Sequence, residues 1–72
     1  MPDDAQTRAE WIAAFAARIG VAPPDEETVT ALLELAGVAA HSSERTAAPI
    51  ACWLVGGAGL SPAAALALAR DV

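Results

Sequence analysis

Lysine, tyrosine and asparagine are absent from this 72-residue chain, and its four basic residues are all arginines. The arginines are scattered at positions 8, 18, 45 and 70, so they form no basic stripe of the kind that contacts to phosphates require. The net charge of −5 also disfavours binding to anionic membrane surfaces. We therefore expect neither nucleic acid nor a membrane among the partners of this protein.

Cysteine is nearly absent as well, with Cys52 as the one example. A single cysteine excludes an internal disulfide and any cysteine-based metal cluster. The acidic run at 25–27 is a poor metal site, because adjacent residues on a helix point apart. The first four residues, Met-Pro-Asp-Asp, lack the apolar segment of a signal peptide. These absences predict a cytoplasmic protein without a metal or cofactor.

The composition that remains is dominated by small apolar residues. Hydrophobic residues make up 56% of the chain, and alanine alone fills more than a quarter of the positions. Alanine is the best helix former, and β-branched and aromatic residues are few, so we expect an all-α fold. At this length we expect one domain over residues 1–72, and a chain so short buries only about 60% of its unfolded surface. An exposed apolar patch or an oligomer interface is therefore expected.

A charge-free run from residue 46 to residue 69 is long enough to span a bilayer. Glycines followed by Ser61 and Pro62 interrupt it, and this pattern is typical of one helix ending and another beginning. A break at that place would leave backbone groups unpaired in lipid. The run therefore predicts a buried helical hairpin.

Local signals place four helices in a compact bundle. Thr7 and Glu10 have capping-box spacing, Gly20 is suited to end the first helix, and Thr46 and Ser61 are candidate N-caps. The expected helices cover about 8–19, 25–41, 47–57 and 62–70. The third is apolar nearly all round, so we expect it at the centre of the bundle.

Large apolar residues recur at helical spacing in the first three helices. In the second helix the expected buried stripe includes Leu32 and Leu33, widened by Leu35 and Val38. The sequence predicts one shared core, made of Trp11, Phe15, Leu32, Leu33, Ile50, Trp53 and Leu54.

Several short motifs resemble a known family: Glu10-Trp11-Ile12, Leu32-Leu33-Glu34-Leu35-Ala36, Ala39-Ala40-His41, Glu44-Arg45, Ala48-Pro49 and Leu54-Val55-Gly56. The chain resembles a small helical domain of unknown function from GC-rich bacteria. Members stand alone or are fused to molybdopterin-guanine dinucleotide biosynthesis proteins of the guanylyltransferase type. The family usually has an Arg-Asp pair where this chain has Gly37-Val38. The resemblance implies a link to molybdenum-cofactor biosynthesis.

Polar residues that could bind a partner gather between the second and third helices. His41, Ser42, Ser43 and Arg45 lie close together in the sequence there, and Pro49 restricts the backbone that follows. His41 can cap a helix end or take part in binding, and Arg45 can close the turn or bind a carboxylate or phosphate. We expect this turn to be the working surface, with Trp53 or Ile50 as an apolar anchor.

No pair of residues has the spacing of a catalytic constellation, so we expect a non-catalytic protein. The favoured function is a helical interaction or accessory module for a larger protein, and the resemblance implies that this protein is an enzyme of molybdenum-cofactor metabolism. One alternative is a small-ligand domain that uses His41 and Arg45 to bind a phosphate or pterin group. Another is a purely structural homo-oligomer formed through the apolar third helix.

Overall fold

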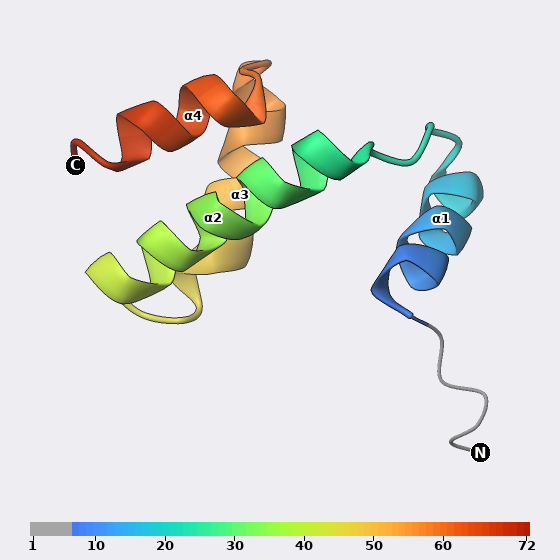
Figure 1. Cartoon of the computed structure of the whole chain (residues 1–72), viewed down its shortest axis with the longest axis horizontal. Coiled ribbons are helices and arrows are strands. Elements are labelled where there is room, and N and C mark those ends of the chain that lie inside the picture. Colours follow the sequence, from blue (N-terminus) through green and yellow to red (C-terminus); the bar gives the residue numbers. More distant parts are fainter. Residues whose placement is uncertain (1–6) are drawn as a thin grey trace.

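The computed structural model describes residues 7–72, and within that range the chain forms four helices and no strand (Figure 1). The all-α, four-helix fold is therefore confirmed, and each helix boundary lies within one residue of its expected position. The expectation about a signal peptide concerns residues that lie outside the described range. The helices are α1 (Arg8–Ile19), α2 (Glu26–Ser42), α3 (Ala47–Ala58) and α4 (Pro62–Ala69).

Both ends of α1 are fixed by local hydrogen bonds. The Glu10 N–H donates to the Thr7 hydroxyl at 3.1 Å, and the Thr7 N–H donates to a Glu10 carboxylate oxygen at 2.9 Å, which completes the capping box. Gly20 ends the helix with a left-handed φ of 81°, where a residue with a Cβ would be strained. The Val21 N–H then donates to the Ala16 carbonyl at 2.9 Å. The helix therefore begins and ends where its own sequence directs.

The other helix starts differ in their capping. Asp25 is the N-cap of α2 and accepts a hydrogen bond from the Thr28 N–H at 2.8 Å. Ser61 caps α4 in the same way, accepting from the Ala64 N–H at 3.2 Å. Thr46 occupies the N-cap position of α3, but its side chain makes no capping hydrogen bond. The start of α3 therefore depends less on its own cap than the starts of α2 and α4 do.

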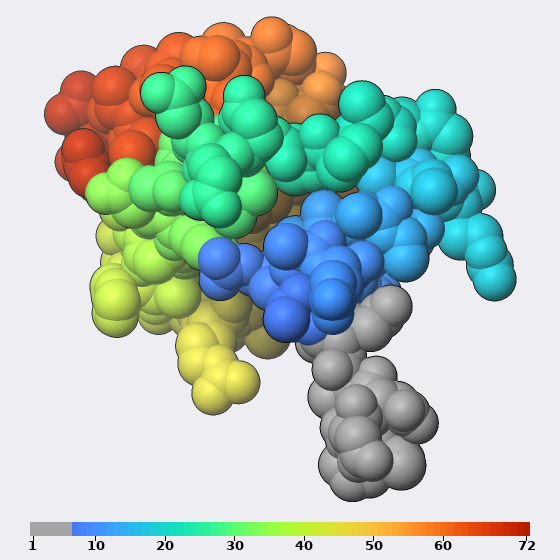
Figure 2. Space-filling view, turned by 45° about the vertical axis from the view of Figure 1, so that its right-hand side comes forward, coloured from blue at the N-terminus to red at the C-terminus, as the bar shows by residue number. Residues whose placement is uncertain are grey.

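The central helix is α2, which packs against both α3 and α4 (Figure 1). The expectation that the third helix is central is wrong, since α3 contains no buried residue. Residues 20–25 lead from α1 into α2, and α1 lies to one side of the other three helices. Figure 2 shows α1 in blue beside the green surface of α2.

The core is smaller than the sequence predicts and is made of different residues. Leu35, Ala65 and Leu66 are buried, and Leu35 is only 3% exposed. Half-buried side chains from α2, α3 and α4 pack around them: Leu32, Val38, Cys52, Val55 and Ala69. Of the predicted core, Leu32 alone packs against this cluster. The other six are exposed: Trp11, Phe15, Leu33, Ile50, Trp53 and Leu54.

The rotation of each helix about its axis explains this correction. On α2, Leu33 lies about 160° around the helix from Leu35, so burying Leu35 turns Leu33 outward. On α3, Cys52 and Val55 face the core, which places Ile50 and Trp53 on the other side. Apolar residues surround much of both helices, so spacing alone does not select the covered side.

The predicted break in the charge-free run is confirmed. Gly59 adopts a left-handed φ of 71° after α3, and Pro62 opens α4. The predicted burial of this hairpin holds only for α4, where Ala65 and Leu66 are buried. Within the described residues, no helix combines the length and the apolar character needed to cross a membrane.

Candidate interaction surface

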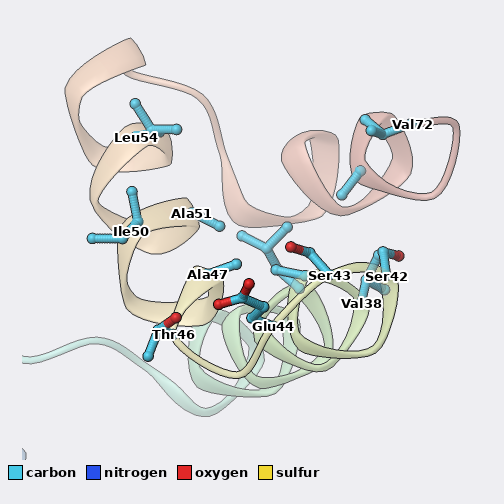
Figure 3. Close-up of a pocket in the computed structure, with 13 residues that line it drawn as sticks. Val38, Ser42, Ser43, Glu44, Thr46, Ala47, Ile50, Ala51, Leu54 and Val72 are labelled. Carbon is cyan, nitrogen blue, oxygen red and sulfur yellow. The ribbon is translucent and has the colours of Figure 1, made fainter.

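An open groove of about 600 Å³ lies between the C-terminal half of α2, the first turns of α3 and the end of α4 (Figure 3). Leu35, Val38 and Ser42 line it from α2. Ile50, Ala51 and Leu54 line it from α3, and Ala69 and Val72 close the third side. The groove thus joins segments that are distant in the sequence.

The turn between α2 and α3 forms one end of this groove. The Ser43 N–H donates to the Ala39 carbonyl at 3.1 Å as α2 ends, and the Ala47 N–H donates to the Glu44 carbonyl at 2.9 Å as α3 begins. Pro49 lies in the first turn of α3, where its missing N–H leaves no intrahelical hydrogen bond unmade. The backbone of the turn is therefore held by its own hydrogen bonds.

The chemistry of the groove favours an apolar occupant. Its polar lining consists of the hydroxyls of Ser42, Ser43 and Thr46 and the carboxylate of Glu44, and the rest is aliphatic. Among residues 7–72, Glu44 has the only charged side chain in the lining, and a carboxylate repels a phosphate group. A side chain from another protein segment suits this lining better than an anion does.

The structure separates the residues that the sequence assigned to one working surface. Of the five candidates, Ser42 alone lines the groove. His41 is exposed in the last turn of α2, and Arg45 is exposed in the turn itself, so neither forms part of the groove wall. Pro49 is exposed at the start of α3, and Trp53 is 74% exposed on a side of α3 that does not line the groove.

Sequence reasoning missed most of the groove wall. The sequence places Val38 only in a buried stripe of its helix and indicates no role for Ala69 and Val72. No local signal places the end of α4 beside the end of α2, because that proximity depends on how the α3–α4 turn directs the chain. The ion pair between Arg70 and Glu34, at 3.6 Å, also joins these two helices.

Two further surfaces consist of exposed large apolar side chains. The α1 face is formed by Trp11, Phe15 and Ile19, and the α3 face by Ile50, Trp53 and Leu54; all six side chains are between 49% and 74% exposed. The rings of Trp11 and Phe15 stack with their centroids 5.2 Å apart, which gives the α1 face a continuous aromatic surface. Ile50 and Leu54 also line the groove, so the α3 face and the groove are continuous.

Residues with catalytic or metal-binding chemistry are dispersed. Within residues 7–72, no three His, Cys, Asp or Glu side chains gather where they could hold a metal ion. Cys52 is half-buried and packs against the core, as expected of a structural thiol. The surface features that stand out are thus apolar.

Comparison with known proteins assigns a family. The family model described as a domain of unknown function (DUF6457) matches residues 3–72. No curated protein and no solved structure matches the chain.

Proposed function

We propose that this chain, which belongs to the DUF6457 family of domains of unknown function, is a non-catalytic helical interaction module. The observation that carries the proposal is the exposure of large apolar side chains on α1 and α3. Isolated exposed apolar residues are common on protein surfaces, but contiguous exposed patches mark interaction sites. Here three such residues lie together on each of two helices, and a groove adjoins one of the two faces.

The residue types on these faces suit protein recognition. Tryptophan is enriched among the residues that dominate binding energy at protein interfaces, and each face carries one. Trp53 is 74% exposed, so it leaves most of its surface available to a partner. The His41–Pro49 turn, which leads into α3, adds an imidazole, three hydroxyls and a guanidinium for polar contacts.

For the partner, we propose a cytoplasmic enzyme of molybdenum-cofactor biosynthesis, of the molybdopterin guanylyltransferase type. This part of the proposal is supported by the resemblance of the chain to domains that occur fused to such enzymes. Fusion of two domains in some proteins is a reason to expect contact between the separate chains in others.

The test is direct binding between this protein and a purified guanylyltransferase of that type, measured by calorimetry. Replacing Trp53 with Ala should weaken binding at least tenfold, which corresponds to about 1.4 kcal/mol. His41→Ala and Arg45→Ala should weaken it less and leave the melting temperature nearly unchanged. Thr30→Ala is the control, because it shortens an exposed polar side chain on α2, outside the two apolar faces and the turn.

Absence of binding by the wild-type protein would refute the choice of partner. If His41→Ala and Arg45→Ala both lower the melting temperature by several degrees and leave binding intact, those two residues serve as a helix cap and a turn closer. The binding surface would then have to lie outside the turn.

A further inference from the structure

We propose that a second copy of this chain covers both apolar faces, with the α1 face of each protomer packed along the α3 face and groove mouth of the other. The inference rests on the proposed function and deepens it by naming one occupant for these surfaces. The second copy and the larger partner enzyme would then compete for the α3 face, because both contacts use Trp53.

The first argument is the area available for burial. A full side chain of these types presents about 150–250 Å². With exposed fractions between 49% and 74%, the six residues of the two faces together expose about 700 Å². A standard stable interface buries about 800 Å² on each partner. Either face alone supplies only about half of that area, so the two faces must be buried together to form a stable dimer.

The second argument is charge. Helix α1 carries Arg8, Arg18 and Glu10, a net charge of +1. Residues 21–72 carry six carboxylates against two arginines, a net charge of −4. The charge of the α1 helix is therefore opposite in sign to that of the α2–α4 unit of another copy. The complementarity is confined to the helix itself, because Asp3 and Asp4 precede it and bring residues 1–20 to a net charge of −1. The α3 face itself bears no charged side chain, so burying it carries no desolvation penalty for a charged group.

The third argument is the place of α1 within its own chain. Arg8, Ala9 and Ile12 of α1 lie around a small hollow with Pro23, Pro24 and the start of α2. This contact uses the side of α1 that carries Ile12 and leaves the α1 face exposed. The groove lies at the other end of α2, around residues 35–42. When the α1 of each protomer docks on the other protomer, the two equivalent contacts form a closed two-fold dimer.

Light scattering coupled to size-exclusion chromatography tests the proposal on the purified chain alone. We expect a mass of twice the 7.3 kDa protomer, with dissociation on dilution. Phe15→Lys and Leu54→Glu should each raise the dissociation constant at least tenfold. The matched controls are Ala17→Lys and Gly56→Glu, each two residues farther along and on the opposite side of its helix. Both positions are exposed, and a Cβ at Gly56 meets no atom within 4 Å.

Mixing the two variants distinguishes this dimer from others. A heterodimer of Phe15→Lys with Leu54→Glu contains one wild-type contact and one contact with opposite charges, so mixing should restore the dimer. Because Trp11 and Trp53 lie in the two faces, dimer formation should also shift tryptophan emission to shorter wavelength. Circular dichroism of each variant shows whether the helices are retained. If the charged variants lose their helices, Phe15→Ala and Leu54→Ala provide milder variants that still remove apolar contact.

Three outcomes would overturn the inference. A wild-type chain that is monomeric at every concentration would mean that α1 closes on its own groove or that another protein covers the faces. A dimer that persists in Phe15→Lys but not in Leu54→Glu would be a direct α3–α3 contact. Failure of the mixture to dimerise would exclude reciprocal exchange. None of these results depends on the guanylyltransferase measurement, so failure of the dimer and failure of the proposed function remain separate.

Discussion

Replacing Leu35 with Ala should destabilise the protein by about 3 kcal/mol. Leu35 is 3% exposed and lies in the buried cluster with Ala65 and Leu66. The substitution removes three buried carbons, each worth about 0.8 kcal/mol of transfer free energy, and adds the cost of the cavity left behind. The surrounding side chains are small and only half-buried, so partial collapse should keep the cost toward the lower part of the usual range of about 2.7–5 kcal/mol.

Leu33→Ala is the matched control for this prediction. Leu33 lies in the same helix and loses the same atoms, but it is 49% exposed, so the expected cost is about 1 kcal/mol. A chain of this length has about 4–11 kcal/mol of stability in total, so Leu35→Ala should remove a large share of it. Urea unfolding followed by helical circular dichroism measures both values at one protein concentration, since dimerisation would make stability depend on concentration. Equal losses for the two variants would refute the assignment of the core.

Two further predictions concern the helix starts. Ser61→Ala should lower the free energy of unfolding by about 1 kcal/mol, because the Ala64 N–H loses its acceptor; an unchanged urea midpoint would show that water replaces the cap without cost. At Asp25, hydrogen bonds from the Thr28 side chain and backbone lower the pKa of the carboxyl below its ordinary value. This group therefore stabilises the fold above its unfolded pKa, and that contribution is lost as the pH falls through the folded pKa. Asp25→Asn retains a capping oxygen but does not titrate, so its urea midpoint should fall less on acidification than that of the wild type.

The sequence could predict only a small part of the candidate surface. The sequence predicts Ser42 and Pro49 in a binding turn and Trp53 or Ile50 as its anchor. Of these residues, Ser42 and Ile50 line the groove. The opposite wall, formed by Ala69 and Val72, has no local signal, because it depends on the direction in which α4 returns. The α1 and α3 faces were predicted as core for a related reason, since apolar spacing indicates that a face should be buried without indicating what buries it.

The sequence by itself determined where each helix begins and ends. The Thr7–Glu10 capping box, the left-handed Gly20 and the Ser61 cap each act through hydrogen bonds between residues at most five positions apart. Such interactions are nearly independent of the rest of the chain, so these boundaries could be predicted. The expected ends of all four helices lie within one residue of the observed ones, although Thr46 at the start of α3 makes no such bond. Only the tertiary structure decided which side of each helix is covered. Leu33 and Leu35 are chemically identical, and the packing of α3 and α4 on one side of α2 buries one and exposes the other.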